Sequence, residues 1–317
     1  MDNLTHTLTG LMLSRAGLNR WYARPALLLV LAANAPDIDV FWSFRGTISY
    51  IENHRAITHS IAMLPVLALL PVIISCVIGR SIRGWKAAWG LSIIGVASHL
   101  LLDWTNAYGI RPLLPFSSRW FQLDLNNIVD FWIWAVLLLA WLGPMVAKLV
   151  SSEIGTAAGS GRGLALFALC FLPVYDFSRF LSHQRAMEML TSRIYQGGVP
   201  LRVAAFPNSA VNPFEWSGWV ETPEMVEHFS LNVLSQFDPS SGTVIYKPDP
   251  NPALDSAQRA FVIQEFLKFA QYPLWRVTPV PDPEGARRVD LRDWRFPFTA
   301  SAIVDASNRV LSSSFHF

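Results

Sequence analysis

Charged residues are scarce in this sequence, and the scarcity is local. Only 15% of the 317 residues are charged and 52% are hydrophobic, whereas a soluble protein usually carries about 25% charged residues. Charges are sparse before about residue 180 and ordinary after it. The length allows two domains. Because the charge-poor part is typical of membrane helices, we predict a mainly α protein. Residues 1–185 are expected to form a polytopic helical membrane domain, and residues 195–317 a soluble α+β domain.

Cysteine and early positive charge are also nearly absent. The two cysteines, Cys76 and Cys170, each lie in an apolar run and are interpreted as small apolar residues of packed helices. No Lys or Arg precedes Arg15, so the N-terminus lacks the basic region of a signal peptide. The net charge of +2 is too small to indicate a nucleic-acid partner.

Long apolar runs dominate the first part of the chain. Four are long enough to suggest membrane helices: residues 60–79, 87–102, 129–147 and 163–181. Two shorter runs, residues 4–18 and 25–35, are expected to form a tilted or re-entrant hairpin. After about residue 195, residues 226–234, 242–248 and 300–315 alternate like strands, and residues 255–271 have helical periodicity.

Polar residues gather where these apolar runs begin or end. Successive crossings alternate in direction, so the starts of outgoing helices and the ends of returning helices lie at the same membrane face. The histidines and carboxylates expected at that face are His6, Asp37, Asp39, His54, His59, His99, Asp103, Asp124 and Asp130. We therefore predict that they form one site, at which all nine are candidate metal ligands.

Spacing and ligand type indicate the metal. His99 and Asp103 are four residues apart in a helical stretch, so their side chains share a helix face. Mixed His and Asp ligands favour zinc, with manganese or iron possible, and argue against calcium. The number of candidates is enough for one or two ions.

Simpler roles exist for several candidates. His6 could be a surface histidine, Asp37 or Asp39 could terminate a helix, and His59 could cap one. Asp130 fits a first-turn acid that the helix dipole favours. His99 is harder to explain in this way, because it lies inside an apolar span, where an ionisable group usually has a function.

Several short motifs, taken in order, resemble a known family. They are "PDID", "HRAITHS", "SHLLLD" and "NAYGIRPLLPF", preceded by "MDNLTHTLTG". In this order they resemble the YdjM-like family of membrane-bound metal-dependent hydrolases. The resemblance covers about residues 1–150 and extends more loosely to "NPFEW" at residues 212–216. It implies an integral membrane protein with hydrolase activity.

A more distant similarity is to the zinc-dependent phospholipase C and P1 nuclease superfamily. Those enzymes gather zinc with an early His, an Asp, a lone His and a His-xxx-Asp helix. His6, one of Asp37 and Asp39, one of His54 and His59, and His99 with Asp103 match these parts. That superfamily adds a second His-xxx-Glu or His-xxx-Asp helix, which this sequence lacks, so the number of metals stays open.

The expected activity is hydrolysis of an ester or phosphoester in a lipid-like or lipid-linked substrate by a metal-activated water. Asp37 or Asp39 is a candidate general base, and Arg55 is a candidate for holding an anionic group. "NPFEW" offers aromatic rings for a lid. The alternative is a non-catalytic membrane protein, with structural metal at its helix ends and a partner-binding C-terminal domain.

Basic residues predict the orientation. The face opposite the site carries eight: Arg15, Arg20, Arg24, Arg80, Arg83, Lys86, Lys148 and Arg162. The first three count only if the first hairpin crosses the membrane, and without them five remain. The short loops of the site face carry four: Arg45, Arg55, Arg111 and Arg119. By the positive-inside rule, the site and the C-terminal domain are expected outside the cytoplasm, on the outer side of the cytoplasmic (inner) membrane.

Overall fold

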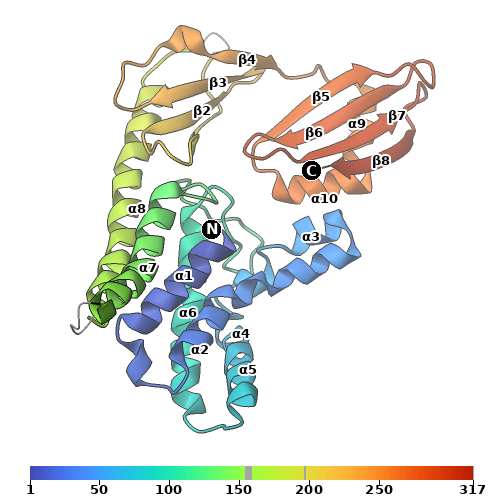
Figure 1. Cartoon of the computed structure of the whole chain (residues 1–317). Helices are drawn as coiled ribbons and strands as arrows, with labels where there is room; N and C mark the ends of the chain where they lie inside the picture. Colours follow the sequence, from blue (N-terminus) through green and yellow to red (C-terminus); the bar gives the residue numbers. More distant parts are fainter. Residues whose placement is uncertain (154–158, 196–197, 317) are drawn as a thin grey trace.

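A computed structural model describes residues 1–153, 159–195 and 198–316, and Figure 1 shows a helical part joined to two β-sheets. The helices of the first part are α1 (Asn3–Arg15), η1 (Leu18–Arg20), α2 (Pro25–Asn34), η2 (Ala35–Arg45), α3 (Thr47–Asn53), η3 (Ile57–His59), α4 (Leu64–Leu67), α5 (Leu69–Gly79), α6 (Trp85–Thr105), α7 (Phe131–Glu153) and α8 (Arg162–Thr191). The η elements are 3-10 helices. The fold class expected from the sequence, a helical membrane domain with a C-terminal α+β domain, is confirmed.

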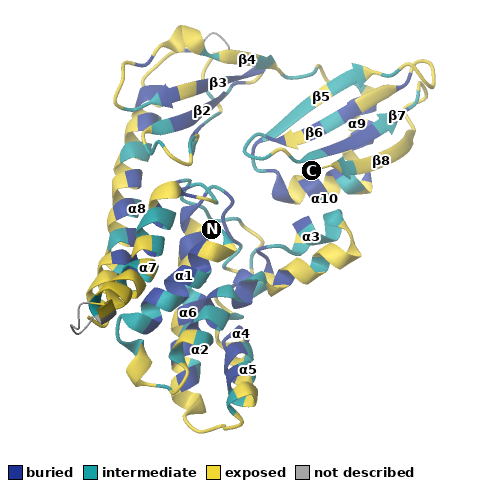
Figure 2. Ribbon diagram, viewed as in Figure 1, coloured by how far each residue is buried: buried dark blue, intermediate teal, exposed yellow. Residues whose placement is uncertain are grey.

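Within the described residues, four helical stretches are long and apolar enough to cross a bilayer: Pro25–Arg45, Trp85–Thr105, Phe131–Ser151 and Arg162–Thr191. A fifth is possible if the pair Thr47–His59 and Leu64–Gly79, bent by 91° at its break, forms one span. Figure 2 shows exposed residues along α7 and α8. Many of these are large and apolar, including Leu139, Phe167 and Val174, as expected of surfaces that face lipid rather than water.

Two details of the expected spans are wrong. Residues 60–79 are not one straight helix, because the chain turns at residues 60–63 and Pro65 then begins a new helix as its second residue. The run at residues 25–35 is not short either, since η2 continues α2 to Arg45. The 3-10 helix η2 carries Asp37 and Asp39, and His59 directly precedes the turn at residues 60–63.

Helices α1, α2 and α6 pack with their backbones close together. A Cβ at Gly10 of α1 would lie 2.6 Å from the Leu29 carbonyl oxygen of α2, and a Cβ at Gly95 of α6 would lie 2.6 Å from the Ala32 side chain. Glycine at these two positions permits the close approach. As a result, His99, one turn after Gly95, reaches the α2 backbone.

The C-terminal part contains two four-stranded antiparallel sheets, each with its strands in sequence order. The first contains β1 (Arg202–Pro207), β2 (Glu215–Glu221), β3 (Met225–Asn232) and β4 (Thr243–Tyr246), with η4 (Pro239–Ser241) between the last two. The second contains β5 (Pro273–Pro279), β6 (Arg287–Asp293), β7 (Thr299–Val304) and β8 (Val310–His316). Helices α9 (Pro252–Gln258) and α10 (Phe261–Phe269) pack on the second sheet around Phe266, Val289 and Leu291. The expected helix over residues 255–271 is therefore two helices.

The C-terminal part lies over one end of the helical part (Figure 1). The end of α8 enters the core of the first sheet through Leu190, and α3 packs against α10. Trp120, in the loop after α6, donates a hydrogen bond from its Nε1 to the Lys268 carbonyl oxygen. The expected domain division between residues 185 and 195 stays a prediction. The end of α8, at Thr191, lies within this interval.

Candidate metal centre

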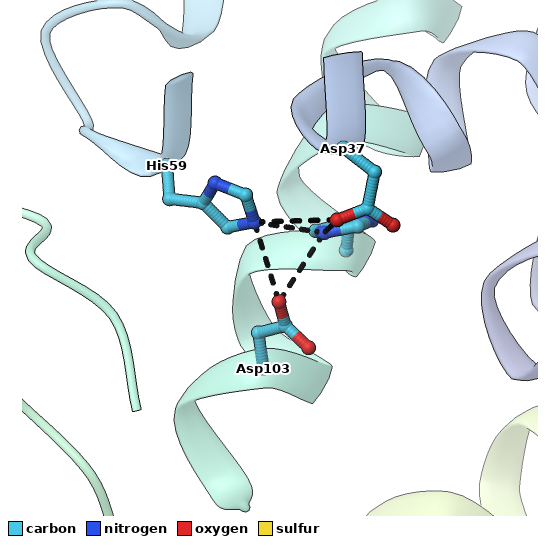
Figure 3. A group of neighbouring side chains, drawn as sticks. Asp37, His59 and Asp103 are labelled. Atoms are coloured by element: carbon cyan, nitrogen blue, oxygen red, sulfur yellow. Dashed lines mark hydrogen bonds and ion pairs between the residues drawn. The ribbon is translucent and has the colours of Figure 1, made fainter. Parts of the chain in front are cut away.

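Four side chains converge at the end of the helical part that faces the sheets. Asp37 comes from η2, His59 from η3, and His99 and Asp103 from α6. One ligand atom from each lies within 4.8 Å of all the others, and Figure 3 draws the group. The two imidazole Nε2 atoms are 3.1 Å apart and each lies 3.3 Å from Asp103 Oδ2. Asp37 Oδ1 lies 3.8 Å from His59 Nε2 and 3.6 Å from His99 Nε2. We call Asp37, His59, His99 and Asp103 the quartet.

The hydrogen bonds on the far side of each imidazole determine what the quartet presents. His99 Nδ1 lies 2.7 Å from the Ala33 carbonyl oxygen, which can only accept, so Nδ1 carries a proton. The Thr58 hydroxyl donates to Asp39 and therefore accepts from His59 Nδ1, at 3.0 Å. In the neutral rings both Nε2 atoms then carry lone pairs. Two lone pairs that face each other at 3.1 Å cannot form a hydrogen bond.

A divalent cation fits between these atoms. Zinc bound tetrahedrally at about 2.0–2.1 Å has ligand atoms separated by about 3.3–3.4 Å. Five of the six distances between these ligand atoms range from 3.1 to 3.8 Å, and all four atoms lie within 4.8 Å of one another. Asp103 Oδ2 is also buried without a hydrogen-bond partner, and buried polar atoms are rarely left unpaired. The described residues thus form a group able to hold a metal.

Asp39 organises the loop beside the quartet. Its Oδ1 lies 2.9 Å from His54 Nδ1, and its Oδ2 accepts from the Arg55 backbone N–H at 2.9 Å and from Thr58. His59 Nδ1 is 3.4 Å from the same Oδ2. Asp39 therefore orients both histidines, as carboxylates beside metal-binding histidines commonly do. Neither Asp39 nor His54 is part of the quartet.

The second oxygen of Asp103 faces positive groups. Arg55 Nη2 lies 3.0 Å from Asp103 Oδ1, and the Met1 amino group is paired with the same oxygen. The Arg55 guanidinium also donates to Asn106 Oδ1 at 3.1 Å and stacks over the Tyr108 ring. Arg55 is buried, so its charge is matched inside the protein.

His6 lies behind the quartet. Its ring stacks on the His99 ring with centroids 3.7 Å apart, and its Nε2 is 3.4 Å from Asp103 Oδ1. Both ring nitrogens are buried and make no hydrogen bond to any part of the chain that the structure describes. His6 is therefore next to the quartet without being part of it.

Asp124 and Asp130 lie apart from the quartet. Asp130 begins α7 by accepting from the Trp132 and Ile133 N–H groups, and the Tyr175 hydroxyl donates to it. Asp124 has a buried Oδ1 with no hydrogen-bond partner among the described residues, and burial raises the pKa of its carboxyl to about 7. Arg295 and Arg202 of the C-terminal part oppose this rise.

A cleft of about 440 Å³ lies between the quartet, which it reaches at Asp37, and the C-terminal part, which it reaches at Phe298. His54, Asp37 and Asp39 line it together with Tyr50, Tyr108 and Phe298, the last from the loop between β6 and β7. Asp37 is the most accessible member of the quartet, with 17% of its side chain exposed, whereas the other three side chains are fully buried. A molecule in this cleft would meet the quartet at Asp37.

The sequence predicted the candidate metal ligands but not the residues that position them and line the cleft. Asn106 fixes the loop after α6, because its Oδ1 accepts from Arg55 and from the Tyr108 and Gly109 N–H groups. The Asn of "NAYG" was a signal for this, since an Asn side chain in a turn typically accepts from the backbone N–H two residues on, as Asn106 does from Tyr108. Phe298 carried no signal. In "NPFEW", Trp216 is fully buried and donates to Ser182, whereas Phe214 is 41% exposed, and the aromatic lid stays a prediction.

Comparison with known proteins agrees with this architecture. The model of the YdjM inner membrane protein family matches residues 1–186. The chain belongs to the YdjM family. It is also 32% identical over 321 residues to the uncharacterized protein YfhP of Bacillus subtilis (strain 168), a match that covers 95% of this chain and 90% of YfhP. No solved structure matches the chain.

Family and geometry together define what is established. The chain is a membrane protein of the YdjM family with apolar helices long enough to span a bilayer. Its buried group of two Asp and two His residues could hold a metal ion. These findings are compatible with a metal-dependent hydrolase.

Proposed function

We propose that this protein is a membrane-bound metal-dependent hydrolase that cleaves an ester or phosphoester bond of a lipid-like substrate. The observation that carries the proposal is the convergence of the quartet at the inner end of a cleft that a histidine–carboxylate pair also lines. A divalent ion of the zinc type, when bound there, lowers the pKa of its water to about 7 and polarises a carbonyl or phosphoryl oxygen.

His54 is the proposed general base. Its Nδ1 is committed to Asp39 at 2.9 Å, which leaves Nε2 as the proton acceptor. Its ring centroid lies 6.2 Å from that of His59, so His54 is close to the quartet without being a ligand. Asp39 is then a positioning residue, which holds His54 and His59 in one arrangement.

Arg55 and Asp37 have separate proposed roles. Since Arg55 is buried against Asp103, we propose that it neutralises the outer oxygen of that ligand and so holds Asp103 in place. Asp37 is the ligand nearest the cleft and the one that a substrate oxygen can approach.

A structural ion is the second candidate function. Four protein ligands close a tetrahedral shell, whereas catalytic zinc usually keeps one position open. The quartet supplies four. In that case the ion would clamp η2, η3 and α6 together, and the C-terminal domain would bind a partner.

The two candidates differ in what His54 does. The purified full chain, supplied with zinc or manganese, is assayed against phospholipids, alkyl phosphates and simple esters. His54→Gln should keep its metal and lose about 10²–10⁴-fold in turnover, while His316→Gln, an exposed histidine of β8, should match the wild type. If no substrate is turned over faster than by Asp103→Ala, the hydrolase proposal fails and the structural ion replaces it.

A further inference from the structure

A second cleft lies between the membrane helices, on the other side of Asp37. It has a volume of about 260 Å³. Its apolar lining comes from α2, η2 and α5, through Leu31, Ile38, Leu70, Pro71 and Ile74. The proposed mechanism does not use this cleft.

The two clefts meet at the quartet. Asn3 and Asp37 line both of them. Because Asp37 is also the accessible member of the quartet, this residue separates an apolar space between helices from a space that faces the sheets. A single elongated molecule that lies past Asp37 would occupy both spaces.

The apolar lining of the second cleft and its position among the membrane helices favour a hydrocarbon chain as its occupant. Its walls belong to the candidate span Pro25–Arg45 and to Leu64–Gly79, the second half of the bent pair. On α5, Ile73 and Val77 are 58% and 69% exposed, as expected of a helix side that faces lipid. Asn3, Asn34 and Asp37 are the polar residues of the cleft lining, so its apolar part offers water few partners, whereas burial of methylenes there is favourable.

We infer that the protein binds an amphiphile across Asp37. Its hydrocarbon chain lies in the cleft between α2 and α5, and its polar head lies in the cleft beneath Phe298. The identity of the head as a hydrolysable group rests on the proposed function, but the binding of the chain does not. Such an amphiphile enters sideways from the bilayer and brings its head to the quartet from the lipid side.

The test measures binding without turnover. A dodecyl phosphate with a photoreactive diazirine at the end of its chain is added to the full-length Asp103→Ala protein in detergent, and the labelled residues are mapped by mass spectrometry. Labels are expected on α2 and α5 at the residues that line the cleft. Ile74→Trp should fill the cleft and reduce labelling there about tenfold, the loss expected when two methylenes lose their burial. Ile73→Trp is the matched control, because its side chain points out of the cleft, and it should label like the parent.

The outcomes separate this inference from the proposed function. Labels spread evenly over the lipid-facing helices, with equal yields in the two Trp variants, overturn the inference even if the wild type hydrolyses phosphoesters. Labels confined to the cleft and reduced by Ile74→Trp support it even if no substrate is hydrolysed. Competition by unlabelled dodecyl phosphate, and not by inorganic phosphate, is the further expected result, and equal competition by both contradicts a role for the chain.

Discussion

Asp103 faces two environments at once, and this makes it the most sensitive residue of the quartet. One carboxylate oxygen points at the two imidazoles and the other at Arg55. Asp103→Ala and His99→Ala should each abolish stoichiometric metal binding, because each removes one of four converging ligands. Asp39→Asn should keep metal with an affinity about 10–100-fold weaker, since it acts through His59.

Metal content of the purified proteins, measured by elemental analysis after dialysis, checks these expectations. His228→Ala is a suitable control, because His228 lies on β3 and bonds to Ser217. Full occupancy in both Asp103→Ala and His99→Ala would place the metal elsewhere.

Asp124 should make the stability of the protein depend on pH. Its pKa is about 7 in the folded protein and 3.8 when exposed, so the folded state binds the proton more tightly. Stability is then greatest below the exposed value and falls as the pH rises toward 7, by a few kcal/mol at most. Asp124→Asn should remove this fall.

Thermal unfolding in detergent at pH 6 and pH 8 measures the effect. The wild type should lose more stability than Asp124→Asn between these two values. Asp249→Asn, a change at an exposed aspartate, should behave like the wild type. Equal pH dependence of wild type and Asp124→Asn would show that another group titrates.

Among the elements, α8 carries a buried arginine that ties the membrane part to the first sheet, in addition to the contacts of Leu190 and Ser182. Arg179 Nε donates to the Leu125 carbonyl oxygen at 2.8 Å, Nη1 donates to the Pro213 carbonyl oxygen, and the guanidinium lies over the Trp216 ring. Arg179→Leu leaves both carbonyls without this donor and should cost about 2–5 kcal/mol. Limited proteolysis should then cut faster between α8 and β1.

Arg185→Leu is the control on the same helix. Arg185 pairs with Glu188 at 3.4 Å, and both side chains are mostly exposed, so the loss should be within about 1 kcal/mol. If the two variants are cut at the same rate, Arg179 does not hold the sheet to α8.

The elements also show which parts of the structure the sequence could predict. The apolar runs predicted the membrane helices, and the alternation of crossings predicted that the ends carrying Asp37, His59 and Asp103 meet. Periodicity could not predict the turn at residues 60–63 or the 3-10 helix that carries Asp37 and Asp39, because both depend on tertiary contacts. His54 is outside the quartet and His59 is part of it, and one oxygen of Asp39 contacts each of these histidines. The order of residues along the chain does not encode these contacts.

For the whole molecule, the arrangement of basic residues bears on orientation. Arg162 donates to the Ala16 carbonyl oxygen, so the start of α8 lies beside the end of α1. This favours counting Arg15, Arg20 and Arg24 with the opposite face. Arg55 is buried and should not be counted as a loop charge. The site and the sheets are therefore expected outside the cytoplasm.

Labelling of intact cells with a membrane-impermeant maleimide tests the orientation. The variants Ser240→Cys and Arg83→Cys are made in a chain that carries Cys76→Ser and Cys170→Ser. Ser240→Cys should be labelled from outside, and Arg83→Cys only after the membrane is opened. The reverse pattern would place the quartet and the sheets inside the cell.

The two facing Nε2 lone pairs also affect the life of the protein in a cell. If the proposed ion is bound, it separates these lone pairs and neutralises the buried carboxylates, so its binding energy becomes part of the folding energy. Membrane proteases would then degrade a newly made chain without the ion faster than a chain that has bound it. Cells starved of the metal should accumulate less of this protein at an unchanged rate of synthesis, so that its abundance would report on metal supply.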